Sequence, residues 1–277
     1  MTFDPNELGR SKQDLAEKLR DLRKRAGLTG EALARLCNVS QSKISKIETG
    51  KTTPSLTDVE CILRAVGAPV EMVQEITALA RLASTEWQDK RSSWRRGIEK
   101  RQAELAALES SATHLRYFLP SMITGLLATP EYIRASLAHT PGDVSGTVAR
   151  KIDRQAILYD TSKNFTFILS EQAVKWAIMP ARVMSVQVDR MISLSHLSNI
   201  QLGVIPYGTI ATRGPMNTFT VYDDRLATAE TFTGRMVFQD ARDVRQHLDL
   251  FALFEEVAVF GSAARDFLGE WSSTYRK

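Results

Sequence analysis

Residues 41–46, Gln-Ser-Lys-Ile-Ser-Lys, combine hydrogen-bonding side chains with a helical apolar spacing. If this stretch is a helix, Ile44 and Ile47 form its only apolar seam, because residues three apart share a face. The opposite face then presents Gln41, Ser42, Ser45 and Lys46, with Lys43 at its flank. The pattern therefore predicts a helix whose polar face is available to another molecule.

The outward side chains match the hydrogen-bonding edges of DNA bases. Glutamine can pair with N6 and N7 of adenine, serine can donate or accept, and lysine can reach O6 and N7 of guanine or a phosphate. The face carries no acid before Glu48 at its end, so nothing on it would repel phosphates. An ordinary solvated helix face is the alternative interpretation.

Catalytic chemistry finds little support in the residue pattern. Ser170 with Glu171, or Asp153 with Arg154, could form an acid–base site only if the fold assembled one. The sequence contains no G-x-S-x-G, H-E-x-x-H, P-loop or dinucleotide fingerprint. A helix cap explains Ser170 and an ion pair explains Arg154, so we expect no enzyme.

Metal and membrane chemistry are also not indicated. Cys37 and Cys61 lie 24 residues apart and the four histidines are dispersed, so neither a zinc spacing nor a disulfide framework is present. We expect no metal and no cofactor. Because no run of about 18 apolar residues and no apolar signal segment occurs, we expect a cytoplasmic protein with no membrane partner.

Length and charge divide the chain. A chain of 277 residues exceeds one typical core and predicts two domains. The net charge of +4 is unevenly placed: residues 1–101 hold 19 basic and 14 acidic residues, whereas residues 102–277 hold 17 and 18. We assign residues 1–82 to the first domain, residues 83–104 to a charged helical linker, and residues 105–277 to the second domain.

The first domain is predicted to be all-α. Apolar residues recur at three- and four-residue steps in residues 13–26, capping residues precede the next three helices, and Pro69 opens the fifth. Thr29 caps the second, in which Leu33 and Leu36 face inward, and Ser40 caps the third. The five predicted helices are residues 13–26, 30–37, 41–48, 56–67 and 69–83. The tight turn between the second and third helices predicts a helix-turn-helix arrangement.

The second domain is predicted to be α+β with a small sheet. A helix is expected from Arg101 to about Tyr117, and alternating apolar residues predict strands in residues 164–170, 200–206, 216–223 and 225–232. One or two helices end the chain. Aromatic and apolar residues of this domain could line a ligand pocket, but we expect most of them to form the core: Phe118, Met122, Phe165, Phe167, Trp176, Tyr207, Phe219, Tyr222 and Phe232.

Residues 19–68, LRDLRKRAGLTGEALARLCNVSQSKISKIETGKTTPSLTDVECILRAVGA, resemble the lambda-repressor-like, Xre-type helix-turn-helix domain. The resemblance implies that Arg23 and Glu48 form an internal structural ion pair. It also implies phosphate binding at the start of the second helix, where Thr29 and Gly30 stand and where a glutamine is common in the family. The remaining implied roles are base reading by Gln41, Ser42 and Lys46, and phosphate contact by Lys43, Lys51 and Thr52.

Residues 105–270 resemble the C-terminal domain of WhiJ-like actinobacterial regulators, through segments such as ITGLLATPEYIRASL, FTFILSEQAVKW and IQLGVIPYG. Thr124 stands where many family members have proline, and Ala128 stands where they have glutamine. The resemblance implies a possible small protein partner encoded by a neighbouring gene, and an antitoxin-like relationship with it.

The sequence therefore predicts a cytoplasmic, sequence-specific DNA-binding transcriptional regulator that binds a double-stranded operator as a homodimer. Two other functions stay open. The chain could act mainly as an antitoxin-like binder of a small partner protein that autoregulates its operon. Alternatively, its second domain could sense a metabolite that the sequence does not identify.

Overall fold

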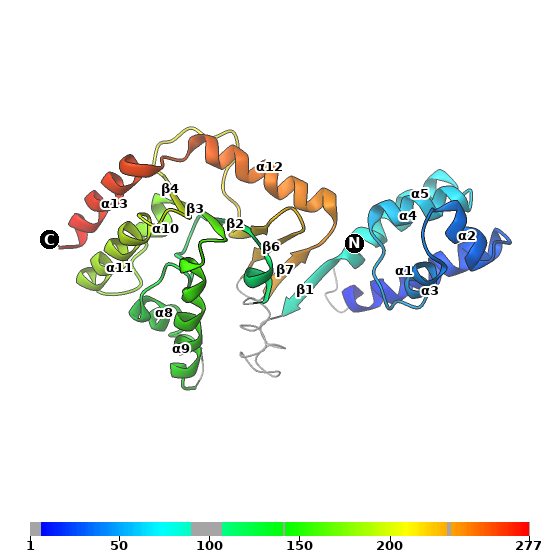
Figure 1. Ribbon diagram of the computed structural model, residues 1–277, viewed down its shortest axis with the longest axis horizontal. Coiled ribbons are helices and arrows are strands. Elements are labelled where there is room, and N and C mark those ends of the chain that lie inside the picture. Colours follow the sequence, from blue (N-terminus) through cyan, green and yellow to red (C-terminus); the bar gives the residue numbers. More distant parts are fainter. Residues whose placement is uncertain (1–6, 90–106, 141, 232–233, 277) are drawn as a thin grey trace. The chain divides into compact units, whose positions relative to one another are not determined.

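The computed structural model describes residues 7–89, 107–140, 142–231 and 234–276 (Figure 1). The chain forms two compact units: Met1–Trp87 with Met236–Asp240, and Gln88–Arg235 with Ala241–Lys277. Among the described residues, no helix combines the length and apolar character needed to cross a membrane. A short segment distant in sequence, Met236–Asp240, belongs to the first unit.

The first unit contains the five helices that the sequence predicts. Thr29, Ser40 and Ser55 each accept a backbone hydrogen bond through the side-chain oxygen and so cap the second, third and fourth helices. The helices are α1 (Glu7–Arg25), α2 (Gly30–Leu36), α3 (Gln41–Glu48), α4 (Leu56–Ala65) and α5 (Val70–Ser84). The all-α, five-helix prediction is therefore confirmed.

One apolar core holds these helices together. It includes buried side chains from every helix: Leu15, Leu19, Leu33, Ile44, Ile47, Val59, Ile62, Leu63 and Ile76. Leu36, predicted to face inward, is 59% exposed. Leu33 and Ala34 bury the face of α2 instead, and Leu36 is the last residue of this seven-residue helix.

The predicted helical linker over residues 83–104 is wrong in its first part. Helix α5 continues to Ser84, and the chain then forms strand β1 (Thr85–Asp89). Threonine and tryptophan favour extended backbone. The charge pattern that suggested a solvated helix does not indicate whether a segment pairs with another strand. Residues 90–104 lie outside the described residues.

The second unit is built around a mixed sheet. Its described strands are β2 (His114–Leu119), β3 (Asn164–Ser170), β4 (Ile200–Ile205), β5 (Phe219–Tyr222) and β6 (Leu226–Glu230). Strand β7 (Gly234–Phe238) begins in the second unit, and its residues from Met236 onward are grouped with the first unit. The sheet order is β1-β7-β6-β5-β2-β3-β4. Strands β2, β3 and β4 pair in parallel, and β5 pairs antiparallel with both β2 and β6. The predicted α+β class is confirmed.

The helix predicted from Arg101 to Tyr117 ends earlier, at residue 111, and β2 replaces its last part. In the second half of β2, Tyr117, Phe118 and Leu119 are apolar and buried in succession, so this half of the strand lacks the alternation that marks a half-buried strand. All four predicted strands are present: β3 has the predicted ends, and β4, β5 and β6 are shorter than predicted. The second unit also contains helical segments α8 (Pro130–Ser136), α9 (Ser145–Asp153), η1 (Arg154–Tyr159), α10 (Glu171–Lys175), α11 (Ala181–Leu194), α12 (Ala241–Val257) and α13 (Gly261–Arg276).

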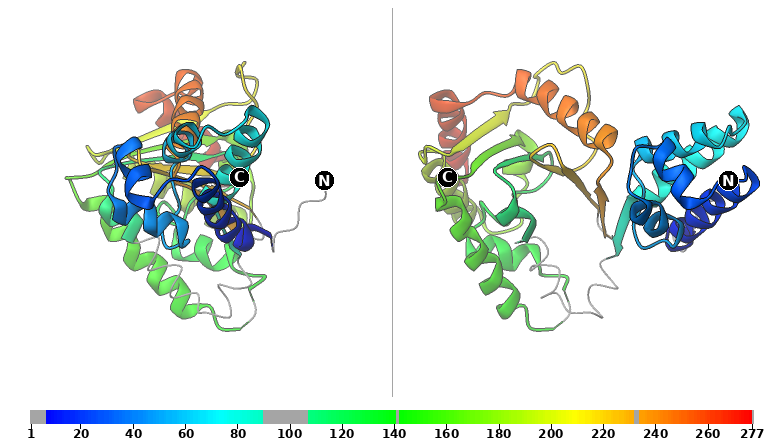
Figure 2. Two further views of the ribbon diagram at one scale, coloured as in Figure 1. Left: turned by 90° about the vertical axis from the view of Figure 1, so that its right-hand side faces the viewer. Right: turned by 45° about the vertical axis from the view of Figure 1, so that its right-hand side comes forward.

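Helices cover both faces of this sheet (Figures 1 and 2). On one face, Tyr117 and Phe167 belong to a core that also contains buried residues of α11 and α13. On the other face, the ring of Phe118 stacks on Phe254 of α12, with ring centroids 3.9 Å apart. The second unit thus has an apolar core of its own.

Candidate nucleic-acid interface

Helix α3 presents the face that the sequence predicts. Ser40 caps it by accepting a hydrogen bond from the backbone N–H of Lys43 at 3.2 Å, and the preceding Asn38 makes the turn with a φ of 51°. Ile44 and Ile47 are 2% and 1% exposed and anchor the helix in the core. The exposed side chains are those of Gln41, Ser42, Ser45 and Lys46.

Neighbouring segments extend this polar surface. Gly50 ends the helix with a φ of 68°, and the exposed residues Lys51 and Thr52 follow, with the Thr52 N–H bonded to the Lys46 carbonyl at 3.1 Å. At the other end, the Gln41 side-chain nitrogen lies 3.9 Å from the position a Cβ would take on Gly30. The start of α2 and the start of α3 are therefore adjacent.

Lys43 has a partner that the sequence analysis missed. Its Nζ atom lies 2.7 Å from Oδ1 of Asp58, while Oδ2 of the same carboxylate accepts the backbone N–H of Ser55 at 3.1 Å in the capping box of α4. Burial acts to raise the pKa of Asp58, but hydrogen bonds from Lys43 and Ser55 outweigh it and hold this pKa below its usual value. Lys43 is thus tied to α4 through Asp58.

Arg23 and Glu48 form the ion pair implied by the family resemblance. The guanidinium donates from Nε and Nη2 to the two carboxylate oxygens at 2.6 and 2.8 Å, and from Nη1 to the Leu28 carbonyl at 2.8 Å. The side chains are 14% and 10% exposed, which is more buried than a free surface pair. Hydrogen bonding to Glu48 raises the pKa of Arg23. The pair joins α1 to the end of α3, so it fixes the orientation of α3.

Asp240 adds a second acid at the start of α4. This residue belongs to the first unit, is 5% exposed, and accepts the backbone N–H of Leu56 at 3.2 Å. An acid at a helix N-terminus stabilises the exposed amide groups there. The contact joins residues 184 positions apart, so no local pattern could have predicted it.

Comparison with known families adds to this geometry. Residues 14–76 match a family described as a helix-turn-helix domain, and residues 102–270, more than half of the chain, match a domain of unknown function, DUF5753. The chain belongs to the DUF5753 family. The helix-turn-helix match indicates a DNA-binding regulator.

The DUF5753 protein has no match among curated proteins. Two solved structures are similar to parts of it. Nuc, a phospholipase D family member from Salmonella typhimurium, has 10% identity and a TM-score of 0.38, covering 64% of this chain and 97% of Nuc. TrmBL2, an archaeal chromatin protein, has 12% identity and a TM-score of 0.33, covering 84% and 87% of the two chains.

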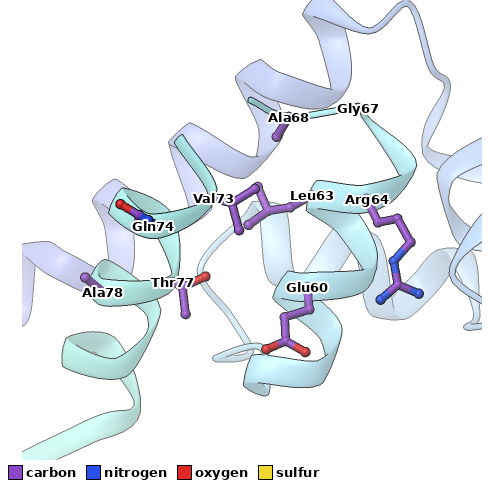
Figure 3. A pocket seen from close by; sticks show the side chains of 9 residues that line it. All are labelled: Glu60, Leu63, Arg64, Gly67, Ala68, Val73, Gln74, Thr77 and Ala78. Carbon is purple, nitrogen blue, oxygen red and sulfur yellow. The ribbon is translucent and has the colours of Figure 1, made fainter. Parts of the chain in front are cut away.

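The first unit of the DUF5753 protein also has a groove of about 780 Å³ between α4 and α5 (Figure 3). Leu63 and Val73 meet at its apolar floor, and Glu60 and Arg64 lie along α4 on one side (Figure 3). The groove has no lining residue from α3. It is therefore a separate surface from the predicted base-reading face.

In the second unit, most aromatic candidates for a ligand pocket belong to the core. The buried ones are Phe118, Phe165, Phe167, Phe219 and Tyr222. Met122, Trp176 and Tyr207 are exposed, and Phe232 lies outside the described residues. The core interpretation is confirmed for the five buried residues.

The paired residues considered for catalysis have structural contacts. Ser170 caps α10 by accepting the Ala173 N–H at 3.1 Å, and its hydroxyl donates to the Pro120 carbonyl at 2.6 Å. Arg154 lies 3.1 Å from the buried carboxylate of Glu109. These contacts agree with the cap and ion-pair interpretations of Ser170 and Arg154.

Proposed function

We propose that this DUF5753 protein is a sequence-specific, DNA-binding transcriptional regulator whose α3 enters the major groove. The observation that carries the proposal is the orientation of α3. Its apolar seam, Ile44 and Ile47, is buried, and the opposite face is exposed and has no acid in its first turn. The major groove admits one α-helix, so these side chains would meet base edges together.

Each exposed side chain has a role in this proposal. Gln41 and Lys46 read bases, since amide and ammonium groups match adenine and guanine edges. Ser42 and Ser45 add further base or backbone contacts from the same face. Lys51 and Thr52 follow α3 and contact phosphates, which would position the helix without reading sequence. The roles of Thr29 and Gly30 at the start of α2 stay a prediction from the family resemblance.

We also propose that the protein acts in the cytoplasm as a homodimer. One helix the length of α3 contacts too few base pairs for high specificity, so paired half-sites about one helical turn apart are expected. The Xre-type and WhiJ-like assignments belong to the same proposal and rest on sequence resemblance alone.

Selection from a random duplex pool tests the proposal, because the operator is unknown. The full-length protein should enrich a two-part motif, and the double variant Gln41→Ala, Lys46→Ala should lose the motif while keeping its circular dichroism spectrum. Arg182→Ala is the matched control, since it removes one positive charge from an exposed position on α11 of the second unit. Enrichment of the same motif by the double variant would count against the proposal.

A second candidate function, binding of a small protein partner, is favoured by the loop after β4. Ile210 and Met216 are 94% and 95% exposed, and Tyr207 is 61% exposed. Contiguous exposed apolar patches mark protein-binding surfaces, and these three side chains lie within one loop of ten residues, 207–216. Coexpression with the product of a neighbouring gene tests this function: a complex that Ile210→Ser with Met216→Ser does not weaken would exclude this loop as its site.

A further inference from the structure

The loop between α3 and α4 carries two side chains assigned to phosphate contact, Lys51 and Thr52, and both are exposed. At the α3 end of the loop, the Thr52 N–H donates to the Lys46 carbonyl at 3.1 Å. At the α4 end, Pro54 and Leu56 are buried. Both ends of the loop are therefore fixed to a helix, and the position of the two exposed side chains depends on both.

Asp240 provides a polar contact at the α4 end. The first backbone N–H groups of a helix have no partner within the helix. At the start of α4, the Ser55 N–H donates to Oδ2 of Asp58 at 3.1 Å. The next N–H, that of Leu56, donates to Oδ2 of Asp240 at 3.2 Å. Asp240 is 5% exposed, and its negative charge lies at the positive end of the helix dipole. This buried contact fixes the residue at which the loop becomes α4.

The acid reaches this position from a distant part of the chain. Met236–Asp240 is grouped with the first unit, whereas Arg235 and Ala241, on either side of it, belong to the second unit. The contact with Leu56 joins residues 184 positions apart. The unit that carries the predicted base-reading face is therefore discontinuous in the sequence, and one of its anchors is covalently joined to the second unit at both ends.

We propose that Asp240 is a positioning residue for DNA binding: it holds the α4 end of the loop so that Lys51 and Thr52 stay in place to contact phosphates. This inference rests on the proposed function and adds to it a residue that acts without touching DNA. A carboxylate that is 5% exposed is buried too deeply to contact a phosphate, and its charge would repel one. Its effect therefore passes through the Leu56 N–H and the loop.

A purely stabilising role for Asp240 is the alternative, and it predicts a different result. If Asp240 only stabilises the first unit, its loss lowers the melting temperature but leaves the DNA affinity of the folded protein unchanged. If it positions the loop, its loss weakens the phosphate contact of Lys51 while the other helices keep their structure. Asparagine separates the acceptor from the charge, because its side-chain carbonyl can accept the same N–H.

Hydrogen exchange of the full-length protein, measured by mass spectrometry, tests the anchor without DNA. Asp240→Ala should raise the exchange rate in peptides that cover residues 50–57 roughly five- to tenfold, the effect of losing one buried hydrogen bond. Peptides from α1 should exchange as in the wild type, and Asp240→Asn should keep most of the protection. Unchanged exchange over residues 50–57, or faster exchange throughout the first unit, would overturn the anchor.

The effect on DNA binding is measured with a duplex selected by the wild type. Asp240→Ala should bind about three- to tenfold more weakly, and the slope of log affinity against log salt should become shallower by about one unit, because one phosphate contact is lost. Asp240→Asn should recover most of the affinity. Asp249→Ala is the matched control, since it removes an acid from an exposed position on α12, and it should bind like the wild type.

A double-mutant cycle with Lys51 decides whether Asp240 acts through the loop. In the Lys51→Ala background, Asp240→Ala should cost less than about twofold in affinity, because the contact that it positions is already gone. An equal loss in both backgrounds would overturn the positioning role. If the wild type selects no duplex, the proposed function fails and the role in DNA binding falls with it, whereas failure of the exchange experiment overturns the anchor alone.

Discussion

The Nζ atom of Lys43 lies 2.7 Å from Oδ1 of Asp58, so a lysine beside the predicted base-reading face is held by an acid at the start of the next helix. The lysine side chain is 42% exposed and the aspartate side chain 15% exposed, which leaves the ammonium group accessible from solvent. A DNA phosphate would therefore compete with Asp58 for Lys43. Contact between Lys43 and a phosphate therefore requires the ion pair with Asp58 to be broken, which costs electrostatic free energy. The sequence alone does not reveal this cost.

Replacing Asp58 should strengthen DNA binding. Asp58→Asn removes a negative charge near the duplex and releases Lys43, so we expect roughly two- to fivefold tighter binding, the size of a partly exposed ion pair. The slope of log affinity against log salt should become steeper by about one unit, because one more phosphate is neutralised. Glu60→Gln, which removes a charge from the groove side of α4, is the control. If Glu60→Gln increased the DNA affinity as much as Asp58→Asn does, a specific role for Asp58 would be contradicted.

The same carboxylate predicts a pH dependence of stability. The pKa of Asp58 is lowered in the folded protein, where bonds from Lys43 and Ser55 outweigh burial. Because its folded pKa is depressed, its stabilisation is complete above the unfolded value of about 3.9 and is lost as the pH falls through the folded value. We expect the thermal midpoint of the wild type to fall more steeply below about pH 4 than that of Asp58→Asn. If the thermal midpoints of the two proteins fell in parallel with pH, groups other than Asp58 would be responsible for the loss of stability in acid.

The Arg23–Glu48 pair should dominate the polar contribution to stability of the first unit. Arg23→Ala leaves a carboxylate that is only 10% exposed and the Leu28 carbonyl without this donor, so we expect a loss of about 2–3 kcal/mol. Arg23→Lys keeps the charge but not the two-pronged geometry and should recover part of the loss.

The matched control is the ion pair of Lys18 with Glu75, whose side chains are 46% and 61% exposed. Lys18→Ala should change the free energy of unfolding by less than about 1 kcal/mol. Urea unfolding of the full-length variants, followed by circular dichroism, compares the two pairs. Similar losses for both would show that burial does not set the strength of the Arg23–Glu48 pair.

The parts of this structure that the sequence predicts are those that local chemistry determines. Ser40 caps α3, and Ile44 and Ile47 are three residues apart, so both the start and the orientation of the helix follow from eight neighbouring residues. The Arg23–Glu48 pair was reached through family resemblance, since it depends on how α1 meets α3.

The parts that were missed depend on packing between distant segments. The partners of Lys43 and Leu56 stand 15 and 184 positions away, and no periodicity indicates which side chains meet across helices. The last part of the predicted helix is strand β2, in which Tyr117, Phe118 and Leu119 are buried in succession and give no period-two signal. Sequence analysis thus found the exposed face of α3 but not the two acids, Asp58 and Asp240, at the start of α4.

Gly203 of β4 should tolerate no side chain, because Phe260 covers it. A Cβ on this residue would lie 2.5 Å from the ring Cε1 of Phe260, closer than real Cβ contacts allow. Gly203→Ala must displace the ring and should destabilise the second unit by about 1–3 kcal/mol. Phe260→Leu in the same chain should recover part of the loss, and Gly269→Ala in α13, where a Cβ meets nothing within 4 Å, should be neutral or stabilising. Circular dichroism melts compare the four proteins, and a harmless Gly203→Ala would show that Phe260 does not pack on β4 in solution.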